Sequence, residues 1–158
     1  MIRGMFRNVE GSIKDPVASW PYEGLVSVIE RGLIIDWVPI FREVRRQPWG
    51  ACARKVERYL SYAPPDGISE AFRRYIELTR EQSVQRDVEQ VAGSVKSAVQ
   101  GTGLTAAAFA ELIGTSASRL STYVSGKVTP SAALMLRIER VAREYGNSVP
   151  IHEPPVRQ

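Results

Sequence analysis

The apolar residues in the first part of the chain recur at helical spacing, in short runs separated by proline and glycine. Intervals of three and four residues place the members of each run on one face of a helix. The three stripes are Leu25, Val28 and Ile29; Trp37, Ile40, Phe41 and Val44; and Cys52, Val56, Tyr59 and Leu60. Each stripe begins near a residue that favours a helix start: the first near Pro21, the second at Asp36, and the third near Pro48 and Gly50. The pattern therefore predicts three short amphipathic helices that start near these residues.

A turn is predicted at Ala63-Pro-Pro-Asp-Gly67, and a longer helical pattern follows it, with Ser69 as the expected cap. This pattern has one stripe of Phe72, Tyr75, Ile76 and Thr79 and a second of Val84, Val88, Val91, Val95 and Val99. Because the second stripe is out of phase with the first, we expect the helix to bend or break near Gln82. The valines make a narrow seam, which serves either packing inside the chain or pairing with a second copy.

After Gly101-Thr-Gly103 the spacing changes, and a compact module of short helices is predicted. Thr105 and Ser116 have the positions and side chains of helix caps. Gly114 can take the left-handed conformation that ends the first helix in a sharp turn, and Ala110 is small enough for two helices to cross closely. The first helix then supports the inner face of the second helix and leaves its outer face exposed, a geometry that fits the major groove of DNA.

No segment alternates with the period of a strand, so the predicted fold class is all-α, with an N-terminal helical domain, a connecting helix and a C-terminal helix-turn-helix module. We expect an arm or loop over residues 1–19, the helical domain over 20–81, the connecting helix over 82–100, the module over 101–146 and a flexible tail over 147–158. The tail is polar and rich in proline.

Composition removes several classes of function. Cys52 is the single cysteine and His152 the single histidine, so an internal disulfide and a multi-cysteine metal site are excluded and a zinc site is not expected. Cys52 lies on an apolar stripe and is expected in the core. The sequence contains no nucleophile–base pair and no glycine-rich phosphate loop, and we expect neither enzymatic activity nor a metal or other cofactor. The net charge of +4 permits a nucleic-acid partner without requiring one.

Membrane association is not expected either. The longest apolar run, around Gly32 to Phe41, is interrupted by Asp36 and Pro39 and is too short to span a bilayer. The N-terminus has no apolar core of the length found in signal peptides. These features predict a soluble cytoplasmic protein.

From Leu104 to about Glu144 the chain resembles the Cro/repressor helix-turn-helix family, often called XRE. The matching positions are Leu104-Thr105, Ala110, Gly114, Ser116, Leu120, Gly126-Lys127 and Pro130-Ser131. The resemblance implies a helix-turn-helix fold, binding to double-stranded DNA and action as a homodimer on a two-fold operator.

The resemblance also implies roles for single residues. The positions that face base edges are Ala117, Ser118 and Thr122, and those near phosphates or the groove rim are Ala106, Ser116, Arg119, Ser125 and Lys127. Family members often carry glutamine at the position of Ala106 and a longer polar residue at that of Ala117. A bidentate base contact contributes roughly 1–3 kcal/mol of discrimination, but Ala117 offers only a methyl group. One copy should therefore bind weakly, and useful affinity requires two copies or further phosphate contacts.

The N-terminal part leaves several functions open. Its basic residues, Arg42, Arg45, Arg46, Arg54, Lys55, Arg58, Arg73 and Arg74, form either a solvated surface or a surface that contacts DNA or an acidic protein. Trp20, Trp37 and Trp49 are expected to pack between helices. The segments around Trp20 and Trp49 loosely resemble domains found beside helix-turn-helix modules in bacterial antitoxins.

Three functions therefore compete. The first is a dimeric repressor. The second is the antitoxin of a toxin–antitoxin system, which neutralises a toxin through its N-terminal domain or tail and represses its own operon. The third is a helix-turn-helix that has been reused for protein interaction or dimerisation. The sequence specifies neither the operator nor the identity of a partner.

Overall fold

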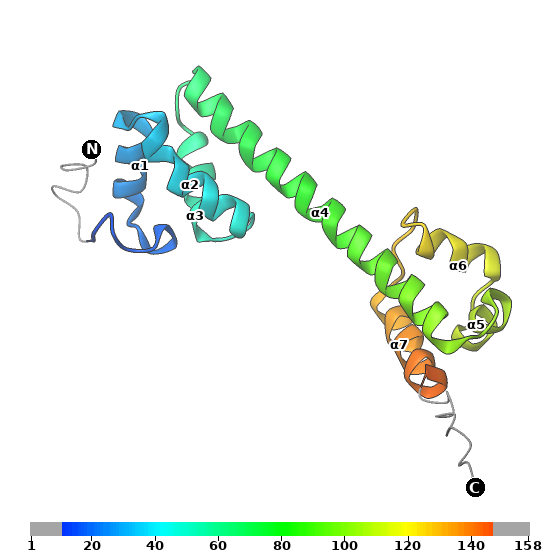
Figure 1. The fold of residues 1–158 in the computed structure, drawn as a ribbon. Coiled ribbons are helices and arrows are strands. Elements are labelled where there is room, and N and C mark those ends of the chain that lie inside the picture. The colour runs from blue at the N-terminus through cyan, green and yellow to red at the C-terminus, as the bar shows by residue number, and fades with distance from the viewer. Residues whose placement is uncertain (1–10, 147–158) are drawn as a thin grey trace, which may run out of the picture. The chain divides into compact units, whose positions relative to one another are not determined.

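The computed structural model describes residues 11–146, which contain seven α-helices, one short 3-10 helix and no strand (Figure 1). The predicted all-α fold is confirmed. The chain divides after Val84 into an N-terminal unit, residues 1–84, and a C-terminal unit, residues 85–158. The expected tail and the first ten residues of the expected arm lie outside the described residues. No helix of the described part is long and apolar enough to cross a membrane.

The N-terminal unit contains the three short helices that the stripes predict. After the 3-10 helix Val17–Ser19, they are α1 (Tyr22–Arg31), α2 (Ile34–Arg46) and α3 (Ala51–Leu60), and the first turns of α4 (Gly67–Thr102) complete the unit. Pro21 and Gly50 stand directly before α1 and α3, where the sequence places helix starts.

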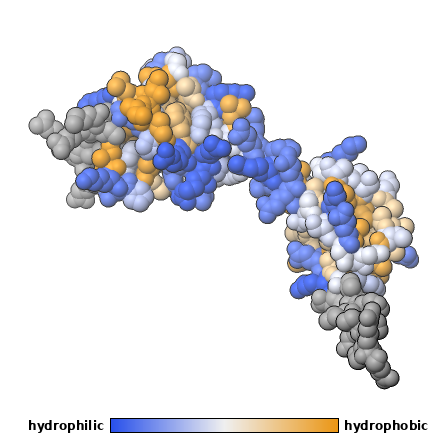
Figure 2. All heavy atoms as spheres, viewed as in Figure 1, coloured by the Kyte–Doolittle hydropathy of each residue, from blue (hydrophilic) through white to orange (hydrophobic). Residues whose placement is uncertain are grey.

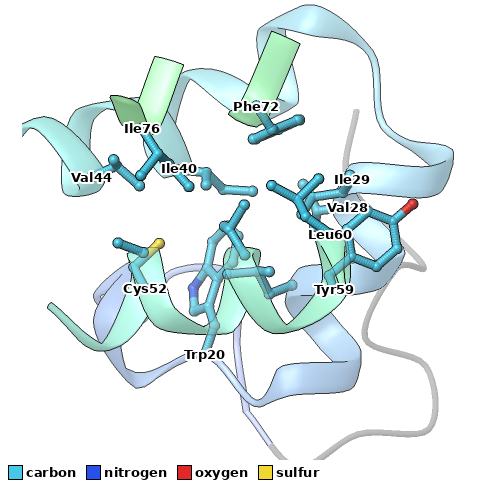
Figure 3. Packing of buried hydrophobic residues seen from close by; sticks show 13 residues of the cluster. Trp20, Val28, Ile29, Ile40, Val44, Cys52, Tyr59, Leu60, Phe72 and Ile76 are labelled. Atoms are coloured by element: carbon cyan, nitrogen blue, oxygen red, sulfur yellow. The ribbon is translucent and has the colours of Figure 1, made fainter. Parts of the chain in front are cut away.

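One hydrophobic core joins these helices. Figure 3 shows Trp20, Cys52 and Phe72 among the side chains that point into it from different segments. All three are only 1% exposed, and the core also holds the predicted stripe residues of α1, α2 and α3. Burial of this much apolar surface is the main favourable term for folding of a small unit. The expected packing of the tryptophans holds for Trp20 and, in part, for Trp37, but Trp49 is 50% exposed.

The corner between α1 and α2 is tightly built. A side chain at Gly32 would bring its Cβ within 2.3 Å of the Val28 carbonyl oxygen, so the backbone approach requires glycine. The buried carboxylate of Asp36 accepts a hydrogen bond from the Leu33 N–H at 2.9 Å, and the indole of Trp37 donates to the Val28 carbonyl at 3.0 Å. Asp36 therefore caps α2 as expected, but from within its first turn.

Polar contacts fasten the start of α4 to its unit. Asp66, rather than the expected Ser69, caps the helix, because the Asp66 carboxylate accepts the Ser69 N–H at 2.8 Å. Further along α4, the guanidinium of Arg80 forms a bidentate pair with Glu57 at 2.6 and 3.1 Å and donates to the Pro48 carbonyl. Such paired contacts fix geometry better than a single ion pair does.

The break expected near Gln82 is absent, because α4 runs without interruption from Gly67 to Thr102. Its last turns belong to the C-terminal unit, with α5 (Ala106–Ile113), α6 (Ala117–Val124) and α7 (Ala132–Gly146). Val95 is fully buried there and Val91 and Val99 pack beside it, whereas Val84 is 51% exposed. Three of the valines thus serve packing inside the chain. The expected limits at residues 81, 100 and 101 stay predictions.

Several basic residues in the described part of the N-terminal unit have local partners. Arg46, Arg73 and Arg74 form ion pairs with Glu43, Glu70 and Glu77. Lys55 donates to the carbonyls of Ala18 and Trp20, and Arg58 lies over the ring of Tyr22. The three ion pairs add little stability, but each glutamate offsets the charge of its arginine and so weakens the positive field of this unit.

The buried position of Cys52 leads to the first prediction. Burial raises the pKa of its thiol to about 12, and the charge of Glu43 adds to that rise. The reactive thiolate should therefore be scarce and inaccessible in the native protein at pH 8. We expect iodoacetamide, followed by mass spectrometry, to leave Cys52 unmodified in the native chain and to label it readily in guanidinium chloride. Rapid labelling of the native chain would contradict the core position.

Candidate nucleic-acid interface

Two short helices, α5 and α6, meet at a sharp turn that the sequence predicts correctly. The hydroxyl of Thr105 accepts the Ala108 N–H and the hydroxyl of Ser116 accepts the Arg119 N–H, each at 3.2 Å, so both expected caps are in place. Gly114 has φ +76°, in the left-handed region that favours glycine. The turn is closed by a hydrogen bond from the Thr115 N–H to the Ala110 carbonyl at 2.9 Å.

The core of the C-terminal unit supports α6 from behind. Leu120 and Tyr123 are buried on the inner face of α6 against Phe109 and Ala110 of α5, in the cluster that also contains Val95 of α4. The small side chain of Ala110, 1% exposed, is consistent with the predicted close crossing of the two helices. The orientation of α6 is therefore set by packing on two other helices.

The turns at both ends of α6 are also held. Beyond its C-terminus Gly126 has φ +74°, and a Cβ there would lie 3.6 Å from side-chain carbons of Val88 and Ala92, so this turn packs on α4. On the other side, Arg137 of α7 donates to the Ile113 carbonyl at 3.3 Å. A cation at this position also interacts favourably with the C-terminal end of α5.

The outward face of α6 carries the residues expected to face bases. Ala117 and Ser118 are exposed, and Thr122 is half-buried. The Thr122 hydroxyl donates to the Arg119 carbonyl at 2.7 Å, and that of Ser125 donates to the Thr122 carbonyl at 3.2 Å. Because these two protons are used within the helix, each hydroxyl presents its oxygen as an acceptor. The face offers short side chains and few donors.

The residues expected near phosphates fall into two groups. Ala106 begins α5 and Ser116 caps the start of α6, whereas Ser125 and Lys127 follow the other end of α6. Eight helical residues separate these ends by about 12 Å. Arg119 is exposed on α6 between them. The structure thus places cations along α6 and just after it, and the roles of the single residues stay predictions.

A hollow of about 300 Å³ lies between α4, α5 and α6, and it brings Ala106 and Ala117 together. Leu120 and Val124 belong to its lining, and so does Lys96 of α4. Sequence reasoning assigned Lys96 to a connecting helix and missed its position beside the predicted interface. One signal was available, because Lys96 is the single cation between Arg86 and Arg119 in the sequence.

Comparison with known proteins bears on this part of the chain. Residues 95–143 match the family model described as helix-turn-helix. No curated protein and no solved structure matches the chain. The match begins at Val95, in agreement with the burial of that residue in the core of the C-terminal unit. The resemblance of the N-terminal part to antitoxin-associated domains stays a prediction. Residues 95–143 of this chain thus match a helix-turn-helix domain, in agreement with the resemblance to the Cro/repressor family predicted from Leu104 to about Glu144.

Proposed function

We propose that the protein is a transcriptional repressor that binds double-stranded DNA as a homodimer, with α6 of each copy in the major groove. The observation that carries the proposal is the helix-turn-helix match at residues 95–143, whose second helix is exposed on its outer face and buried on its inner one. This arrangement is the one that presents a recognition helix to base edges.

The composition of α6 explains why a dimer is part of the proposal. The side chains Ala117, Ser118 and Thr122 supply a methyl group and single hydrogen bonds, each below the roughly 1–3 kcal/mol that a bidentate base contact contributes. Affinity then comes mainly from phosphate contacts by Arg119, Lys127 and, from α4, Lys96. Two copies on a two-fold site double both kinds of contact.

The proposal predicts a salt-dependent decrease in affinity when cations beside the phosphates are removed. We expect the Arg119→Ala/Lys127→Ala variant to bind all duplexes more weakly, because both cations are exposed along or beside α6. Removing one cation that neutralises a phosphate lowers the slope of log K against log salt by about 0.9, so removing two from each subunit of a dimer should change it by about 3 to 4. Fluorescence anisotropy on the DNA upstream of the gene and on a scrambled duplex, at several salt concentrations, measures both quantities.

A matched variant controls for the change of net charge. Arg140→Ala/Arg143→Ala removes two exposed cations from the later turns of α7 and should leave the slope nearly unchanged. Equal slopes for the wild type and the Arg119→Ala/Lys127→Ala variant would contradict the docking of α6 on DNA. Equal affinity of the wild type for the two duplexes would contradict a sequence-specific repressor.

Base preference should depend on the two hydroxyl groups of α6. We expect Ser118→Ala and Thr122→Val each to reduce discrimination between the upstream site and its single-base variants by about 1 kcal/mol, or about fivefold, because each removes one hydrogen bond to a base. Their affinity for the scrambled duplex should stay close to that of the wild type, because the phosphate-binding cations are retained. Competition anisotropy with single-base variants gives the comparison. A uniform decrease in affinity for every duplex would assign the two residues to general affinity instead.

A second candidate function, antitoxin, is favoured by one observation. The N-terminal unit has a hydrophobic core of its own, separate from that of the helix-turn-helix domain, and so can hold a surface unrelated to DNA. On this candidate we expect the product of the neighbouring gene to co-purify with the full chain and its toxicity to be relieved by co-expression. If that product neither binds the chain nor becomes less toxic, the antitoxin function is excluded and the repressor proposal is unaffected.

A further inference from the structure

The N-terminal unit exposes bulky apolar side chains at the start of α2. Leu33, Ile34 and Ile35 are 69%, 73% and 68% exposed, and Val38, one turn further, is 37% exposed. Figure 2 shows apolar residues gathered on the surface of this unit. Single exposed apolar residues are ordinary, whereas large contiguous groups of them are a feature of interaction sites.

The fold holds these side chains outward. The next two residues, Asp36 and Trp37, turn inward and are fixed by hydrogen bonds to Leu33 and to the Val28 carbonyl. The Gly32 N–H donates to the Val28 carbonyl at 3.0 Å and holds the same corner. Rotating α2 to bury Ile34 and Ile35 would expose Asp36 and Ile40, which are 4% and 0% exposed. Exposure of the apolar group is therefore a built-in property of the corner.

The same exposed face of α2 continues into positive charge. Arg42 follows Val38 by four residues and Arg45 follows Arg42 by three, which keeps them on one side of the helix. Both are exposed, and within residues 11–146 neither forms an ion pair. The next arginine, Arg46, is neutralised by Glu43 at 2.7 Å. We call this face, made of Leu33, Ile34, Ile35, Val38, Arg42 and Arg45, the α2 stripe.

We propose that the α2 stripe docks an amphipathic, acidic segment of a partner protein, with apolar side chains on Ile34, Ile35 and Val38 and carboxylates on Arg42 and Arg45. The charge of the stripe argues for this occupant. DNA would pair with the arginines and leave the apolar half exposed to water. A second copy packed through the same face would cover the apolar half, but the stripe itself contains no acidic residue to pair with the arginines. An acidic amphipathic helix matches both halves of the stripe, because its apolar side chains and its carboxylates can lie on one face at the same helical spacing.

The proposal does not rest on DNA binding, and it can be tested with synthetic peptides and the full-length chain. The probe is an amphipathic helical peptide with leucines along one face and glutamates at one end of that face. One control peptide has lysine in place of each glutamate, and another has the same composition in scrambled order. Isothermal titration calorimetry with the wild type should show binding of the glutamate peptide alone.

Variants of the stripe localise the binding. Arg42→Gln/Arg45→Gln and Ile35→Ser/Val38→Ser should each weaken the glutamate peptide about tenfold or more, the equivalent of about 1.4 kcal/mol. The matched control, Arg73→Gln/Arg74→Gln on α4, removes the same charge and should bind as the wild type does. All substituted positions other than half-buried Arg73 are exposed on their helices, and thermal melting checks that each variant is folded. Hydrogen exchange should show that the peptide protects amides of α2.

Several results would overturn the proposal. They are failure of the glutamate peptide to bind, equal binding of the lysine peptide, and an equal decrease in affinity in the Arg73→Gln/Arg74→Gln control. Sedimentation could give a fourth contradicting result. If the wild type is a dimer and the Ile35→Ser/Val38→Ser variant is a monomer, a second copy of the chain occupies the α2 stripe. The same variants should retain wild-type affinity for the upstream duplex. Because the two experiments use different ligands, a negative result with the peptides does not contradict DNA binding. A negative result with DNA likewise does not affect the interpretation of the peptide experiment.

Discussion

The short length of α5 and α6 is the constraint on which the helix-turn-helix unit depends. Helices of eight residues are far below the length at which an isolated helix is stable in water, so their hydrogen bonds alone cannot hold them. Their stability comes from a shared core that includes Val95 of α4 and Ile138 of α7. One consequence is that the last turns of α4 are an essential part of the domain. Another is that the outer face of α6 is free to carry small residues, because no outward side chain is needed to hold the helix in place.

The sequence predicts well whatever depends on local chemistry. Periodic apolar positions located α1, α2 and α3, and the caps Thr105 and Ser116 and the left-handed Gly114 located the turn between α5 and α6. In each case the residue type follows from a local requirement of the chain. Apolar residues form the buried face of a helix, a hydroxyl group caps a free N–H group, and glycine adopts a positive φ. For the candidate interface this was enough to place α6 and its outward residues, although not to establish what each residue contacts.

What the sequence did not predict depends on packing between distant segments. Asp66 and Ser69 are both good caps, and the choice of Asp66 leaves Ser69 in a buried position of the first turn. The change of phase near Gln82 suggested a break, but it marks instead the place where one continuous helix passes from one core to another. Lys96 was missed for the same reason, since its position beside Ala106 and Ala117 arises only when α4 packs on α5 and α6. The exposure of Ile34 and Ile35 likewise follows from the inward turn of Asp36 and Trp37.

The positive charge of the chain becomes informative only when partners are taken into account. A net charge of +4 is consistent with many functions, and several arginines of the N-terminal unit are neutralised by a glutamate three residues away. An unpaired cation alone also says little, because solvent screens it. An unpaired cation indicates a partner only when a second feature lies beside it. For Arg42 and Arg45 that feature is the pair of exposed isoleucines, and for Arg119 it is the helix α6, whose inner face is buried in the core. The partner proposed for Arg42 and Arg45 is an acidic and apolar segment, and the partner proposed for Arg119 is a DNA phosphate. Both surfaces suit anionic groups, but only the first also exposes bulky apolar side chains, so we assign them two different partners. The short side chains of α6 are compatible with regulation by a protein bound elsewhere on the chain.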